Sequence, residues 1–192
     1  MEEVDDAISA SGGASTLIPA DLNKPEQIAQ LGPALTERFG RLDILVANAA
    51  ILGTLSPVAL SDAKIWEGVF RTNVFANYHL IRALDPLLRG SDAGRAIFVT
   101  SGVAQRPRAF WSAYAASKAA LEAMARAYAD EVAYSPLKVN ILDPGAVATS
   151  MRADAFPAED PATLPAPESL VPAFLDLAAP HDMATGRVVK AA

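Results

Sequence analysis

The sequence predicts an α/β fold in which a parallel sheet is covered by helices on both faces. Segments with strand character alternate with segments of helical periodicity along the chain. Two predicted strands, residues 42–47 and 95–100, are apolar at most positions, as strands buried on both faces are. The 192 residues suit one domain, which we place over 1–192. We therefore expect a single doubly wound domain.

Turn-forming residues divide the chain into its predicted elements. Gly12 and Gly13 end a short helix, and Gly40 ends a longer amphipathic one. Ser61 and Asp62 can cap the helix that follows the second strand. The predicted helices cover residues 2–10, 24–39, 61–88, 112–133 and 169–177. The predicted strands cover residues 14–19, 42–47, 95–100, 138–142 and 187–190, and a proline-rich loop precedes the last helix.

Composition excludes several classes of site and partner. The chain has no cysteine, so it has no disulfide, thiolate metal ligand or cysteine nucleophile. The net charge is -6 and the basic residues are scattered, so we expect neither nucleic acid nor an anionic membrane as partner. The acidic start and the lack of a long apolar run predict a cytoplasmic protein. His79 and His181 have no neighbours that form a ligand set, and we expect no metal.

Tyr114 and Lys118 form the strongest candidate pair. Residues four apart on a helix share one face, and both lie in the predicted helix over 112–133. A fixed ammonium beside a phenol favours the phenolate and should lower the Tyr114 pKa from its usual value near ~10. Such a phenol can exchange a proton with a carbonyl or alcohol oxygen. The spacing alone leaves a surface pair open as the alternative.

Other polar residues follow the predicted strands, where ligands bind in sheets of this kind. Asn48, Ser101 and the pair Pro144-Gly145 come at the ends of three strands and should share one edge of the sheet. A loop separates Ser101 from Tyr114, so both side chains can reach the opening of the same site. A helix cap or a turn residue is the alternative for Ser101. In that loop, Phe110 and Trp111 could line a substrate pocket or be buried in packing.

Taken together, these motifs resemble the short-chain dehydrogenase/reductase family of the classical type. The matching segments are Leu45-Val46-Ala47-Asn48-Ala49-Ala50, Arg71-Thr72-Asn73-Val74, Val99-Thr100-Ser101, Tyr114-x-x-x-Lys118 and Asp143-Pro144-Gly145 with Thr149. From Tyr114 to Pro161 the sequence is most similar to a bacterial subgroup of uncharacterised members. The resemblance implies a Rossmann-like fold and an oxidoreductase that uses NAD or NADP to interconvert a carbonyl and a secondary alcohol.

The resemblance also implies a role for each matching residue. Tyr114 would be the general acid/base, and Lys118 would lower its pKa and bind the nicotinamide ribose. Ser101 would hydrogen-bond the substrate oxygen, and Asn73 would anchor a water that links Lys118 to solvent. Further cofactor contacts would come from Asp21, Leu22, Asn48, Ala49, Ala50, Pro144, Gly145, Val147 and Thr149. A homodimer or homotetramer built on helices 61–88 and 112–133 is implied as well.

The sequence departs from the family pattern in two places. Ala50 stands where the family usually has glycine. In addition, Gly12 and Gly13 follow a helix and precede a strand, the reverse of a pyrophosphate-binding turn. We therefore expect the first strand-helix-strand unit to be absent, the edge at 42–46 to be bare and dinucleotide binding to be weak. The sheet should hold four firm parallel strands from residue 42 onward, with the strand over 14–19 either loose or paired directly against residues 42–46.

Two alternatives to a dehydrogenase stay open at this point. One is a truncated, non-catalytic remnant that serves at most as a binding or assembly partner. The other is an extended-type epimerase or dehydratase, which is less favoured because only residues 146–192 follow Gly145.

Overall fold

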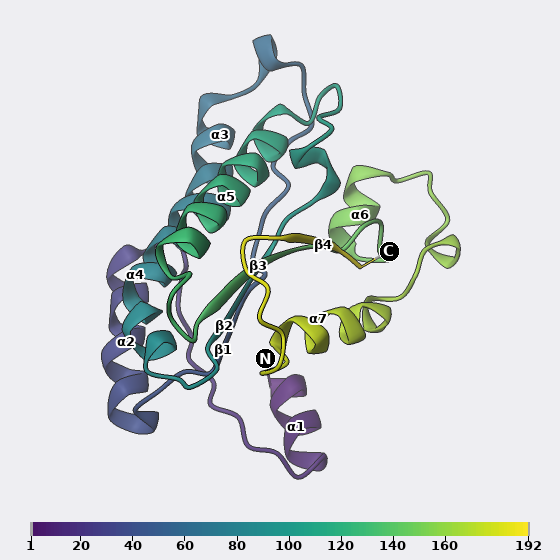
Figure 1. Ribbon diagram of the computed structural model, residues 1–192. Coiled ribbons are helices and arrows are strands. Elements are labelled where there is room, and N and C mark those ends of the chain that lie inside the picture. The colour runs from purple at the N-terminus through teal and green to yellow at the C-terminus, as the bar shows by residue number, and fades with distance from the viewer. Residues whose placement is uncertain (1, 192) are drawn as a thin grey trace.

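A four-stranded parallel sheet lies between helices in the computed structural model, which describes residues 2–191 (Figure 1). The strands are β1 (Ile44–Ala47), β2 (Arg95–Val99), β3 (Lys138–Asp143) and β4 (Val188–Lys190). They lie in the order β1-β2-β3-β4, and each neighbouring pair is parallel. The predicted Rossmann-like α/β fold is thus confirmed.

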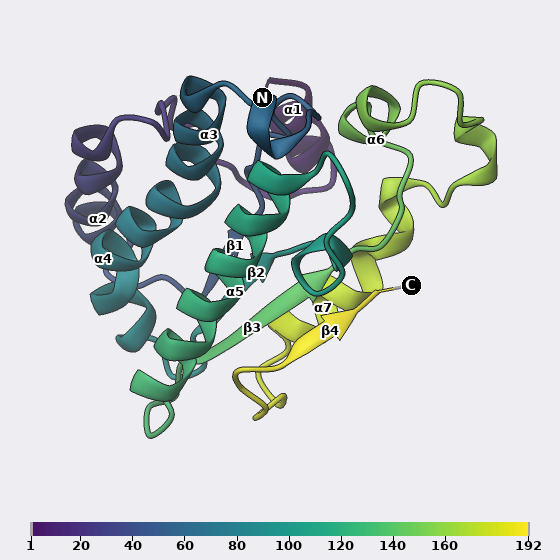
Figure 2. The same cartoon turned by 90° about the horizontal axis from the view of Figure 1, so that it is seen from above.

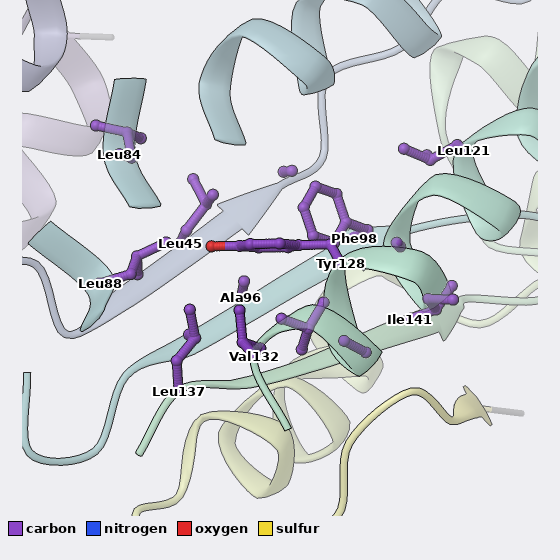
Figure 3. Close-up of a cluster of buried hydrophobic side chains, with 14 of the residues drawn as sticks. Leu45, Leu84, Leu88, Ala96, Phe98, Leu121, Tyr128, Val132, Leu137 and Ile141 are labelled. Atoms are coloured by element: carbon purple, nitrogen blue, oxygen red, sulfur yellow. The ribbon is translucent and has the colours of Figure 1, made fainter. Parts of the chain in front are cut away.

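One face of the sheet carries the main hydrophobic core. It is covered by the helices α2 (Pro25–Phe39), α4 (Ala76–Arg89) and α5 (Ser112–Glu131). The strands contribute Leu45, Phe98 and Ile141 to this core. The helices and the turn after α5 contribute Leu84, Leu88, Leu121, Tyr128 and Val132 (Figure 3). Burying each large apolar side chain contributes about 1.5–3 kcal/mol, so this face holds much of the fold together.

The opposite face is covered by the helix α7 (Val171–Ala178), so the sheet is doubly wound (Figure 2). Ile97 and Leu142 alternate with residues of the main core along β2 and β3, and they pack against Leu177. This cover does not extend to β1, where Ile44 and Val46 are 44% and 45% exposed. In the described part of the chain β1 pairs with β2 alone, so its other edge is bare, as the sequence predicted.

The N-terminal segment differs from the prediction. The helix α1 (Glu2–Ala10) forms as expected, but it buries none of its residues. Residues 14–19, expected as a strand that is either loose or paired against 42–46, form no strand and pair with none among residues 2–191. Leu17 and Ile18 are each 40% exposed. A β-strand needs a neighbour to accept its hydrogen bonds, and local apolar character cannot supply one.

The predicted helix over residues 61–88 is divided. The helix α3 (Ala63–Phe70) begins at Asp62, whose side chain caps it by accepting a 2.8 Å hydrogen bond from the Lys64 amide. A π-helical turn over Arg71–Phe75 then separates α3 from α4. This turn places Thr72 and Asn73 in the interior. Such bulges inside α-helices are frequent at functional sites, which makes Asn73 a residue of interest.

After β3, residues 144–170 form a flap, which the sequence predicted as a proline-rich loop. It contains the short helix α6 (Ser150–Ala155) and two single 3-10 turns, Pro161–Thr163 and Pro167–Leu170. Further 3-10 turns occur at Val58–Leu60 and Gly102–Ala104. Within residues 2–191, none of the helices is both long and apolar enough to cross a membrane.

Candidate active site

A cleft of about 410 Å³ lies at the carboxyl ends of the strands. Its volume falls within the about 300–1,000 Å³ of small-molecule sites. Most of the residues that the sequence proposed for the site line it. They are Asn48, Ala49, Ala50, Ser101, Tyr114, Lys118, Pro144, Gly145, Val147 and Thr149. Strand ends at one edge of a parallel sheet converge on one place, which explains why these segments meet.

Tyr114 projects into the cleft from the first turn of α5 and is only 7% exposed. Burial raises the pKa of its phenol to about 12, because it disfavours the phenolate. Hydrogen bonding by the Ser101 side chain lowers the Tyr114 pKa, whereas the charge of Asp143 raises it further. The sequence led us to expect a lowered Tyr114 pKa, and that expectation is wrong for this structure. Tyr114 is instead held as a neutral phenol, able to donate a proton.

Lys118 lies one helical turn further along the same face of α5 and is 2% exposed. Its ammonium donates a 2.8 Å hydrogen bond to the Val99 carbonyl oxygen and lies 5.7 Å from the centroid of the Tyr114 ring. Burial lowers the Lys118 pKa to about 8. Lys118 therefore changes its protonation state near pH 8.

Asn73 lies beside the cleft without lining it. Its Oδ1 accepts a 2.9 Å hydrogen bond from the Ile51 amide, and its Nδ2 donates to the Ile51 carbonyl and to Ser117 Oγ, both at 3.0 Å. The side chain thus braces the loop after β1 against α5, the helix that carries Tyr114. The water-anchoring role that the resemblance implied for Asn73 stays a prediction.

Asp21 and Leu22 are not among the residues that line the cleft. The Asp21 carboxylate accepts hydrogen bonds from the amide and side chain of Asn23, at 2.9 and 3.1 Å, and the amide bond is the main cause of its lowered pKa. Asn23 Oδ1 in turn accepts a 2.9 Å bond from the Thr72 hydroxyl. Here Asp21 forms a turn before α2, and its implied contact with adenine stays a prediction.

The flap supplies lining residues that sequence reasoning missed. Met151, Arg152, Ala155 and Leu170 reach the cleft from the flap, and Phe174 reaches it from α7. Their positions depend on how a proline-rich segment folds back over the sheet, and no local pattern encodes that.

Of the two aromatic residues in the loop before α5 that could line a substrate pocket, one lines the cleft and the other does not. Trp111 lines the cleft, as one reading of the sequence proposed. Phe110 is 56% exposed, has a left-handed backbone with φ 73°, and is not among the lining residues.

A buried acid, Glu122, fixes the segment that leads from the end of β2 to Ser101. The Thr100 hydroxyl donates a 2.8 Å hydrogen bond to Glu122 Oε1, and Glu122 is 6% exposed. The second carboxylate oxygen accepts a 3.2 Å bond from Arg126. Because Glu122 follows Lys118 by one turn of α5, this contact fastens the strand end to the helix that carries the other site residues.

Comparison with known proteins agrees with this architecture. A family model described as short chain dehydrogenase matches residues 1–160. The uncharacterized oxidoreductase YciK of Escherichia coli K12 is 42% identical over 150 residues, which are 78% of this chain and 59% of that protein. This chain spans only 53–59% of the lengths of the first three curated relatives it matches.

Solved structures of short chain dehydrogenases have the same fold over nearly the whole of this chain. A short chain dehydrogenase from Pseudomonas syringae superimposes with a TM-score of 0.96 at 35% identity, covering 100% of this chain and 79% of that one. One from E. coli CFT073, complexed with NADPH, gives a TM-score of 0.93 at 37% identity over 99% and 82%. The chain belongs to the short-chain dehydrogenase family.

Proposed function

We propose that this chain carries the catalytic residues of an NAD(P)-dependent oxidoreductase that interconverts a small-molecule carbonyl compound and a secondary alcohol. One observation carries the proposal: Tyr114 and Lys118 are buried one helical turn apart in a cleft at the strand ends. Ser101 lines the same cleft and lowers the pKa of the Tyr114 phenol. Perturbed pKa values of neighbouring groups in a cleft mark acid-base sites.

The proton chemistry follows from the two buried side chains. With a pKa of about 12, the Tyr114 phenol keeps its proton at neutral pH and can donate it to a carbonyl oxygen. The Ser101 hydroxyl, which lines the same cleft, can donate a hydrogen bond to that oxygen and stabilise the charge that develops there. Lys118, with a pKa of about 8, can return a proton toward Tyr114. The nicotinamide cofactor, when bound, supplies or accepts the hydride.

The residues present fit the ribose and nicotinamide half of such a cofactor. The Lys118 ammonium has three donors, and one of them bonds the Val99 carbonyl, so two remain for ribose hydroxyls. Gly145 and Thr149 line the cleft at the end of β3. Among the described lining residues, no glycine-rich turn leads from a strand into a helix to hold the pyrophosphate. NADP and NADPH are the first cofactors to try, because related structures are complexes with them.

Replacing Tyr114 with phenylalanine tests the proposal. Reduction of a ketone panel is followed by loss of NADPH absorbance, with the cofactor at millimolar concentration. Tyr114→Phe keeps the ring and loses the proton donor, so turnover should fall by about 10²–10⁴-fold with cofactor affinity nearly unchanged. Tyr134→Phe is the matched control, because Tyr134 is fully exposed. Unchanged turnover in Tyr114→Phe, or no turnover by the unmodified chain with either NADPH or NADH, would contradict the proposal.

A further inference from the structure

Of the described charged side chains that line the cleft, only the arginine is paired with a carboxylate of the chain. Lys118 and Arg152 are the only charged side chains among the described lining residues. Lys118 donates to the Val99 carbonyl. Arg152 donates two hydrogen bonds of 2.6 Å, from Nε and one terminal nitrogen, to the two carboxylate oxygens of Glu159. An anionic group on a substrate would therefore have to compete with Glu159 for Arg152.

Arg152 is also fixed in place by an aromatic ring. Its guanidinium carbon lies 3.8 Å from the centroid of the Phe156 ring. Paired guanidinium–carboxylate contacts are among the strongest and most directional that proteins form, and stacking on a ring restricts the side chain further. The pair with Glu159 thus belongs to the folded form of the flap, and it leaves this side of the cleft with little net charge.

The wall beside Tyr114 is aromatic and apolar. The Trp111 ring meets the Tyr114 ring edge-on, with centroids 6.1 Å apart and planes at 69°. The same indole lies 5.6 Å from the Phe156 ring. Like Trp111, Leu52 and Met151 pack against the buried cluster that contains Tyr114, from the loop after β1 and from α6. Trp111 therefore connects the proton donor with the flap, and a group attached to a carbonyl at Tyr114 would lie against the indole.

We propose that the substrate carries an uncharged aromatic group next to its carbonyl and no carboxylate or phosphate at that end, with Trp111 as the residue that selects for it. Aromatic rings gain from edge-on or offset contacts at centroid distances of about 4.5–7 Å, and this cluster offers such partners. This inference rests on the proposed function and names the substrate class of the same site.

Binding can be read without turnover, because the chain has two tryptophans. Trp66 lies on α3, stacked on Phe70, and does not line the cleft. In Trp66→Phe the fluorescence comes from Trp111 alone, and Trp111→Phe gives the matched control for unspecific quenching. Three probes of similar size separate the chemistry: acetophenone, its saturated counterpart cyclohexyl methyl ketone, and benzoylformate, which adds a carboxylate.

Acetophenone should change the Trp111 signal saturably, about three- to ten-fold more tightly than cyclohexyl methyl ketone. Benzoylformate should bind at least about ten-fold more weakly than acetophenone. In Glu159→Gln, which frees Arg152, benzoylformate should gain affinity while acetophenone keeps its own. Saturation-transfer NMR with Trp111→Leu should show the preference for acetophenone over the saturated ketone lost.

Three results would overturn the inference: tightest binding of benzoylformate to the unmodified site, equal binding of the two neutral ketones, or no saturable change with any ketone. These results are distinct from a failure of the proposed function. If Tyr114→Phe leaves turnover intact while acetophenone binding is selective, the catalytic assignment fails and the substrate class stands. If turnover depends on Tyr114 but benzoylformate is preferred, the substrate class fails.

Discussion

Replacing Lys118 with methionine should stabilise the protein at neutral pH, although the residue belongs to the proposed catalytic set. Burial lowers the Lys118 pKa from 10.5 to about 8. Below the folded-state pKa the group is charged in both states, so the folded state bears the full cost of burying an ammonium. Between about pH 8 and 10.5 the unfolded chain binds more protons than the folded one, so stability rises with pH across this window.

The size of the effect follows from the same pKa values. A shift of one pKa unit corresponds to about 1.36 kcal/mol, so the fall of the Lys118 pKa from 10.5 to about 8 corresponds to about 3 kcal/mol of the free energy of unfolding. Methionine removes this penalty, and it also removes the 2.8 Å hydrogen bond to the Val99 carbonyl, which contributes about 1 kcal/mol. We therefore expect Lys118→Met to unfold at higher urea concentration, with a net gain of about 2 kcal/mol at neutral pH.

Urea unfolding at about pH 7 and about pH 9.5 measures both the gain and its pH dependence. The unmodified protein should be more stable at the higher pH, and Lys118→Met should lack this increase. Above about pH 10 the raised Tyr114 pKa acts in the opposite direction, because the folded state then holds a proton that the unfolded chain releases. Lys64→Met, at an exposed position, is the control. A variant less stable than the unmodified protein at pH 7, or with the same pH dependence, would refute the reasoning.

Three further expectations concern stability, assembly and cofactor affinity. Arg95→Met should lower the free energy of unfolding by about 2–4 kcal/mol, because the buried guanidinium donates to four backbone carbonyl oxygens, two of them after α7; equal urea midpoints would contradict this. Ala123→Arg places an unpaired charge on the exposed small-residue side of α5, where we expect a homodimer or homotetramer contact, and should release monomers. A sedimentation profile like that of the unmodified protein would exclude this interface. Calorimetry of the 192-residue chain should show NADH and NADPH binding more weakly than micromolar, because the described lining residues offer no pyrophosphate turn. A micromolar dissociation constant for either cofactor would show this account of the site to be wrong.

The parts of the fold that were predictable are those where one local pattern determines the structure. In Arg95–Val99 the last four residues are all apolar, which is the pattern of a strand buried on both faces. The segment forms such a strand. Residues 14–19 have similar local character but no neighbouring strand, and they form none. The burial of Arg95, at 1% exposure, was also beyond sequence reasoning, because most of its carbonyl partners are far along the chain.

The site divides in the same way. Asn48, Ser101 and Gly145 could be placed because the ends of parallel strands share one edge of the sheet. Arg152 could not, since its position depends on the path of the flap. The direction of the Tyr114 pKa was also missed, because sequence shows the charged neighbour at Lys118 and hides the degree of burial, which is the larger effect here.

The π-helical turn at Arg71–Phe75 divides one long helical segment into two parts that pack against different helices. α3, before the turn, packs mainly on α5, and α4, after it, packs mainly on α2. Each residue advances an α-helix by about 100°, so one additional residue in a turn rotates everything downstream by about that angle. Deleting a single residue here would leave two well-formed helices whose apolar faces point in incompatible directions. The segment should therefore tolerate substitution at its exposed positions, such as Phe75, far better than any change in length.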